Sequence, residues 1–134
     1  MQLNHDIIKD TLTIFVDSEE LNIYTTDVMD LLSDKYEEKS VIFNMEKMME
    51  TGLIDFCSDN YTRIASPTSS GYYLTSAPME ILMPGLSYYD VVKNESFFEK
   101  VKSTMKNQAL EITIELGKMY LKELGKQALG LGGD

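Results

Sequence analysis

The chain has 134 residues and a mass of 15.2 kDa, the size of one ordinary domain or of one domain with an appendage. Apolar residues make up 43% and charged residues 25%, which excludes a disordered chain, and no apolar run is long enough for a membrane span. The net charge of −10 lies in residues 1–60, which hold 4 basic and 14 acidic residues, whereas residues 61–134 hold 8 of each. An acidic surface repels phosphate, so nucleic acid is disfavoured as a partner and basic partners are favoured; the equal alternative is that the charge serves solubility alone.

Two helices are predicted in the first third of the chain. Asn4 is a good N-cap, and Asp6 stands in the first turn, where the helix dipole favours an acid. Apolar residues fill most of the circumference that follows, so this helix is expected to be deeply buried. A second helix is expected to be capped by Thr25 or Thr26, after a short extended stretch at 21–24.

A third helix is predicted over residues 38–50, followed by Gly52 as a left-handed C-terminal residue. Its core face is expected to consist of Val41, Ile42, Met45, Met48 and Met49. Phe43 falls on the opposite face, beside Lys47 and Glu50. An aromatic ring there suits a protein interface, although another helix of the same chain could equally cover it.

Short strands are predicted after the third helix. Residues 54–57 and 61–65 are interpreted as a β-hairpin, residues 66–71 as a loop, and 72–75 and 80–83 as two further strands. Three helices followed by a hairpin are typical of a winged helix-turn-helix domain. The predicted fold class is therefore α+β, mostly α, with an acidic winged-helix-like domain at 1–83 and a helical C-terminal extension at 84–134.

The extension is predicted to contain helices at 86–93 and 95–105, the second capped by Asn94. Residues 108–129 also carry a wide apolar stripe at helical spacing. Apolar and polar residues alternate over 110–116, so a strand is the alternative there. A helix is preferred because the whole segment is too long for a typical strand. Residues 130–134 are expected to fray.

The C-terminal stripe predicts self-association, most simply as a two-fold homodimer. The candidate residues are Ile112, Leu116, Met119 and Tyr120. The alternative is that the stripe packs wholly against its own domain.

Three stretches resemble a family of uncharacterised proteins encoded by phages and prophages of low-GC Gram-positive bacteria. They are Leu3 to Asp6 with Ile8, Lys9 and Asp10; residues 36–54, including Ile42-Phe43, Glu46-Lys47 and Gly52; and Gly85, Tyr88-Tyr89, Asp90, Val92-Lys93, Phe97-Phe98 and Lys102. The chain departs from the family at Leu86, Phe98 and Glu37, where histidine, tryptophan and serine are usual. The family has no established activity, so the resemblance implies only a fold and a phage context.

No catalytic, cofactor or metal site is predicted, and the chain is not expected to be an enzyme. His5 is interpreted as a packing or capping residue and Cys57 as a small buried one, while Asp6 and Asp10 share a helical face without a catalytic partner. Acids at 34, 37 and 38 lack the spacing of a calcium loop. A single cysteine and no signal peptide predict a cytoplasmic protein.

The leading hypothesis is protein–protein interaction with a host or phage partner. The candidate interface residues are Phe43, Lys39, Glu46, Lys47 and Glu50. A DNA-binding transcriptional regulator and an acidic nucleic-acid mimic that inhibits a host enzyme are the alternatives.

Overall fold

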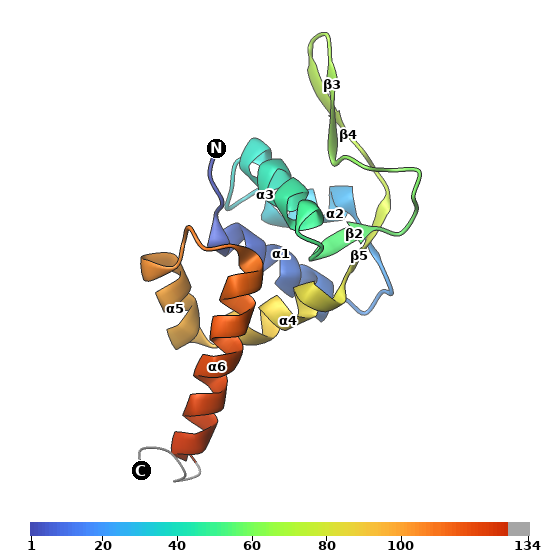
Figure 1. Cartoon of the computed structure of the whole chain (residues 1–134). Coiled ribbons are helices and arrows are strands. Elements are labelled where there is room, and N and C mark those ends of the chain that lie inside the picture. The colour runs from blue at the N-terminus through green and yellow to red at the C-terminus, as the bar shows by residue number, and fades with distance from the viewer. Residues whose placement is uncertain (129–134) are drawn as a thin grey trace. The chain divides into compact units, whose positions relative to one another are not determined.

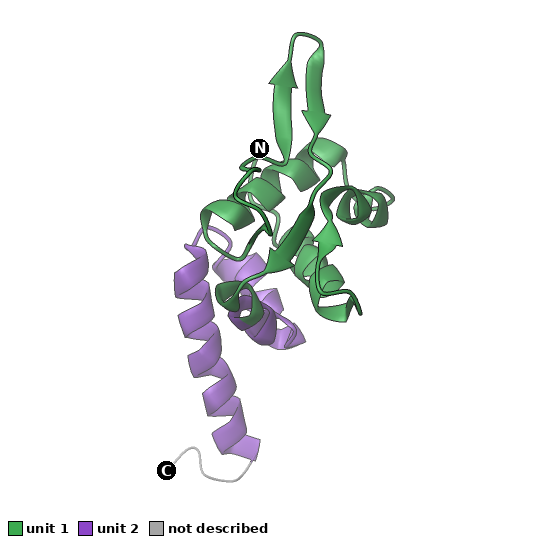
Figure 2. Ribbon diagram, turned by 90° about the vertical axis from the view of Figure 1, so that its right-hand side faces the viewer, with its two compact units in different colours: residues 1–86 green, residues 87–134 purple. Residues whose placement is uncertain are grey.

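The computed structural model describes residues 1–128 and divides into two compact units, residues 1–86 and 87–134 (Figure 2). The described residues form six helices and five strands, so the expected α+β class with a predominance of helix is confirmed. The boundary between the units falls within the fourth helix, α4 (Met83–Val92). No helix in the described part of the chain combines the length and the apolar character that a membrane crossing needs.

Three helices occupy the first half of unit 1: α1 (His5–Asp17), α2 (Thr25–Leu32) and α3 (Glu38–Glu50). The predicted cap of α1 is confirmed, because the Ile7 amide donates to the Asn4 side chain at 3.1 Å. The predicted threonine cap of α2 is wrong. Tyr24 holds the N-cap position without a side-chain bond, and the Thr25 hydroxyl instead donates to the carbonyl of Thr75. That bond joins α2 to a segment 50 residues later in the chain.

The predicted hairpin of residues 54–57 with 61–65 is also wrong. The observed main sheet is antiparallel with the order β1-β5-β2, formed by β1 (Ile23–Tyr24), β5 (Pro78–Ile81) and β2 (Ile54–Phe56). Phe56 pairs with Met79, not with a residue just beyond the turn. Residues 54–56 do form a strand, with Ile54 and Phe56 buried and Asp55 exposed. A sequence pattern can indicate such a strand, but it cannot identify the strand that pairs with it.

A separate hairpin, β3 (Ala65–Thr68) with β4 (Gly71–Leu74), is inserted between β2 and β5 and projects from unit 1 (Figure 1). The sequence predicted a loop over 66–71, but only Ser69 and Ser70 form the turn. Gly71 closes that turn with a φ of +141°, a conformation that side chains rarely adopt.

The core of unit 1 lies between the helices and the main sheet. The predicted α3 core residues Val41, Ile42, Met45 and Met48 are buried, and Met49 is half-buried. Asn44 is also fully buried, which the sequence did not indicate. Its side chain accepts from the Asn4 amide at 2.8 Å and donates to the Ser40 carbonyl at 2.8 Å, so its polar atoms are satisfied.

Unit 2 contains the end of α4, together with α5 (Glu95–Thr104) and α6 (Leu110–Ala128). Asn94 caps α5 as predicted, accepting from the Phe97 amide at 3.0 Å. Residues 110–116 lie in α6, so the strand alternative is excluded. Gly117 of α6 packs so closely that an added Cβ would lie 2.4 Å from Val91 Cβ and 2.8 Å from Phe97 Cε2. Residues 130–134, which were expected to fray, lie outside the described residues.

Candidate interaction surface on α3 and the β3–β4 hairpin

Two polar contacts join α3 to the hairpin and to the segment that leads into it. Arg63, just before β3, places its Nε 3.3 Å from Glu46 Oε2. The Tyr72 hydroxyl of β4 donates to Glu38 Oε1 at 2.6 Å, and this hydrogen bond raises the pKa of Tyr72. The first contact involves the segment before the hairpin and the second involves the hairpin itself, so α3, Arg63 and Tyr72 contribute to one surface.

A hollow of about 410 Å³ lies between α3 and the hairpin, and Phe43 stands in it half-buried. Its lining consists of Met1, Lys39, Ile42, Phe43, Glu46, Arg63, Ala65, Pro67, Gly71 and Tyr72. The Lys47 ammonium lies 5.6 Å from the centroid of the Phe43 ring, within the range of a cation–π contact. Phe43 is therefore neither a core residue nor a fully exposed one.

The cations of this surface are largely engaged by carboxylates. Lys47 Nζ lies 3.2 Å from Glu50 Oε2, and Arg63 is bound to Glu46. Lys39 is exposed at the edge of the hollow. Two of the three cations at this surface, Lys47 and Arg63, are thus paired with carboxylates that offset their positive charge.

A second groove, with a volume of about 460 Å³, adjoins the first beyond the Glu46–Arg63 ion pair. It is lined by Glu46, Met49, Glu50, Asp55, Ser58, Asp59, Tyr61, Thr62 and Arg63. The five interface residues predicted from the sequence thus all lie at one of the two grooves or at the Phe43 ring. The sequence missed Arg63 and Tyr72, because their place beside α3 depends on a strand pairing that was predicted wrongly.

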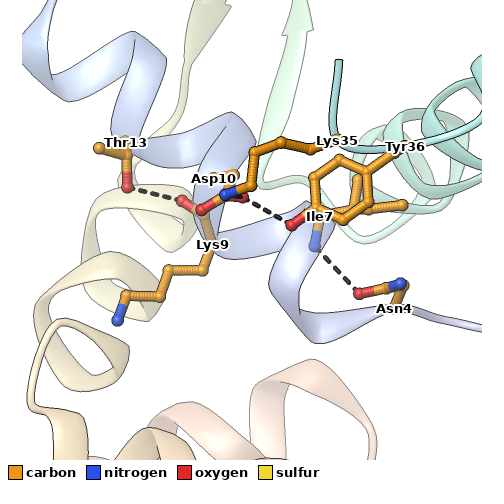
Figure 3. A network of polar contacts seen from close by, with 7 residues as sticks. All are labelled: Asn4, Ile7, Lys9, Asp10, Thr13, Lys35 and Tyr36. Carbon is orange, nitrogen blue, oxygen red and sulfur yellow. Dashed lines mark hydrogen bonds and ion pairs between the residues drawn. The ribbon is translucent and has the colours of Figure 1, made fainter. Parts of the chain in front are cut away.

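Asp10, one of the two acids that share a face of α1 and were interpreted as ordinary surface acids, is part of a structural network (Figure 3). The Tyr36 hydroxyl donates to Asp10 Oδ2 at 2.6 Å, and Lys35 Nζ lies 2.9 Å from the same oxygen. Burial, followed by the bond to Asp10, raises the pKa of Tyr36 well above its usual range. The network fastens the segment between α2 and α3 to α1. His5, at the start of α1, is buried.

The expectation that Cys57 is buried is wrong, because the residue is exposed directly after β2. Partial desolvation and the neighbouring Glu80 raise the pKa of its thiol. A raised pKa reduces the fraction of the reactive thiolate at neutral pH. Among the residues that the structure describes, no three His, Cys, Asp or Glu side chains gather closely enough to hold a metal ion.

The predicted self-association residues of α6 separate into two groups. Ile112, Leu116 and Met119 are exposed by 48%, 40% and 66%, and their spacing of four and three places them on one stripe. Tyr120 instead packs within unit 2, with its ring centroid 5.4 Å from that of Phe97 and its hydroxyl 2.7 Å from Ser96 Oγ.

Neither a protein-family model nor a curated protein matches this chain, and no solved structure matches it either. The resemblance to phage and prophage proteins stays a prediction that depends on the residues quoted for it.

Proposed function

We propose that residues 1–86 form a winged-helix domain that binds a protein, and that the chain is not an enzyme. In the proposed phage or prophage setting, the partner is a host factor or another phage component. The order of elements supports the fold assignment. The elements α1, β1, α2, α3 and β2 are followed by the projecting β3–β4 hairpin and then by β5. Strand β5 lies between β1 and β2 in the main sheet. In this arrangement α3 is the recognition helix and β3–β4 is the wing.

The observation that carries the functional proposal is the half-buried Phe43 in the hollow between α3 and the hairpin. Aromatic anchors in such hollows contribute much of the binding energy at protein interfaces. The hairpin adds Tyr72, which is exposed by 37%, and tyrosine is enriched at these interfaces. Lys47 and Arg63 are engaged by Glu50 and Glu46, so the same surface is poorly suited to phosphates.

Phe43→Ala tests the proposal. Because the ring is half-buried, its truncation should lower the free energy of unfolding by about 1 kcal/mol, less than the roughly 3–5 kcal/mol expected for a core phenylalanine. Partner capture from host lysate by the tagged protein should be lost. Nuclease treatment should not affect capture by the unmodified chain.

Tyr73→Ala is the matched control, because Tyr73 alternates with Tyr72 along β4 and faces away from the hollow. It should retain the partner. Equal capture by Phe43→Ala and the unmodified chain would contradict the proposal.

A DNA-binding regulator is the second candidate, and the position of α3 beside a wing favours it. Fluorescence anisotropy with a random duplex separates the two functions. We expect no appreciable binding at physiological salt, because residues 1–86 carry 15 acidic and 5 basic groups. Low-micromolar binding that weakens steeply with added salt would favour the regulator.

We also propose that the α6 stripe of Ile112, Leu116 and Met119 forms a homodimer contact. Leu116→Glu should convert the dimer to a monomer in light scattering, because it places a charge in an apolar interface. Leu21→Glu is the control, since Leu21 is fully exposed in unit 1. An unmodified chain that is monomeric at tens of micromolar would refute this contact.

A further inference from the structure

We infer that the ligand of the α3–hairpin surface is a basic peptide segment of the partner, which places one large apolar side chain beside Phe43 and a lysine or arginine in the adjoining acidic groove. This inference rests on the proposed function and specifies the chemistry of the partner.

The Phe43 hollow provides the apolar half of the site. Pro67 and Tyr72 from the hairpin and Ile42 from α3 line it together with the half-buried Phe43 ring. Its volume of about 410 Å³ exceeds that of any single side chain, so an aromatic or aliphatic residue can enter together with part of its backbone. Entry would remove from water apolar surface that is now partly exposed, and this burial is the main source of favourable free energy.

The adjoining groove provides the charged half. Its lining holds four carboxylates, those of Glu46, Glu50, Asp55 and Asp59, against the single cation of Arg63. Glu46 and Glu50 are each engaged by a cation. In the described part of the chain, neither Asp55 nor Asp59 has an ion-pair partner, so this groove retains an unneutralised negative charge.

The walls of the acidic groove also fit the long side chain of a lysine or arginine. Met49 is half-buried, and the Tyr61 ring, exposed by 43%, lies 5.7 Å from the Phe56 ring. An arginine or lysine can lay its methylene stem against such apolar walls while its charged end reaches the carboxylates. A nucleic acid would bring phosphates to these same carboxylates and be repelled.

The two halves adjoin each other, because Glu46 and Arg63 line both. A short segment with an apolar and a basic residue close in sequence can therefore occupy both at once. The Arg63–Glu46 pair at 3.3 Å forms the partition between them.

Selection from a displayed library of short random peptides on the immobilised full chain tests the inference. We expect the enriched peptides to combine lysine or arginine with a neighbouring Phe, Trp or Leu. In fluorescence anisotropy, synthetic versions of the enriched peptides should bind the double variant Glu50→Lys/Asp59→Lys about tenfold more weakly than they bind the unmodified chain. Glu19→Lys/Asp34→Lys, which changes the same net charge at exposed acids outside both grooves, should bind them with unchanged affinity.

The outcomes separate this inference from the proposed function. Enriched peptides that lack basic residues but lose binding in Phe43→Ala would overturn the inference and leave the protein-binding surface in place. Peptides that are insensitive to Phe43→Ala would count against both. A selection that enriches nothing, equal binding by the two charge-reversed variants, or salt-sensitive binding of a random duplex would each overturn the inference.

Discussion

Residues 1–86 hold 15 acidic and 5 basic residues, whereas residues 87–134 hold 7 of each. The contacts that stabilise each unit internally also differ. In unit 1, polar side chains join segments far apart in the sequence. The Asn4–Asn44 bond spans 40 residues and the Thr25–Thr75 bond spans 50. In unit 2, Gly117 allows α6 to approach Val91 and Phe97 closely, and the packing there depends on shape.

The exposed surfaces differ in the same way. On the surface of unit 1, Lys47 lies over the Phe43 ring, and a surface that combines charges with an aromatic ring can discriminate between partners by charge. The α6 stripe is apolar at Ile112, Leu116 and Met119, and next to it Lys118 lies 3.9 Å from Glu115. The two units therefore expose surfaces of different chemistry: unit 1 is acidic with a half-buried aromatic ring, and unit 2 is neutral in net charge with an aliphatic stripe.

Gly117→Leu should have the largest effect on stability. Its Cβ would lie within 3 Å of Val91 and Phe97, so the helices must separate, at a cost of about 3 kcal/mol. Hydrogen exchange should accelerate in α5 and α6 and change little in α1 and α3.

Gly125→Ala provides the control on the same helix, because nothing lies within 4 Å of an added Cβ there. It should stabilise α6 by about 0.5–1 kcal/mol through helix propensity alone. Destabilisation of the two variants by equal amounts would contradict shape-dependent packing at Gly117.

Asn44→Ala should produce the corresponding loss in unit 1. It removes the acceptor of the Asn4 amide, and an unsatisfied buried donor costs about 1–3 kcal/mol. Chemical denaturation should show this loss, and exchange should accelerate at the start of α1. Asn22→Ala, at an exposed position, should change stability by less than about 0.5 kcal/mol.

Titration of the half-buried Tyr36 and the buried Tyr88 should give the smallest and most selective difference. The pKa of Tyr36 is raised by burial and then by its bond to Asp10, whereas burial raises the pKa of Tyr88. Asp10→Asn should therefore lower the pKa of Tyr36 and leave that of Tyr88 unchanged. Tyrosinate absorbance of the variant, with Tyr36→Phe and Tyr88→Phe to assign the signals, measures both.

The same shifts predict how stability depends on pH. Below about pH 10, the usual tyrosine pKa, both hydroxyls keep their protons in the folded and unfolded states, so their contribution to stability is fully present. Above it the unfolded chain loses these protons first, and stability falls as pH rises toward the raised folded pKa values. Tyr36→Phe should reduce that fall, and an unchanged slope would contradict the role of Tyr36.

The sequence by itself determined most of the local structure. Asn4 and Asn94 cap their helices as predicted, and α3 has the predicted bounds of residues 38 and 50. Gly52 follows α3 with a φ of +77°. These features depend on residues within a few positions of one another, so periodicity and capping preferences suffice to predict them.

Only the tertiary structure decided which segments meet. The pairing of β2 with β5, the burial of Asn44 and the place of Arg63 beside Glu46 each join residues at least 17 positions apart. Hydrophobic patterns specify which side of a strand or helix is buried but not what covers it. That the five candidate residues share α3 was therefore predictable, whereas the place of the hairpin beside them depends on contacts distant in sequence.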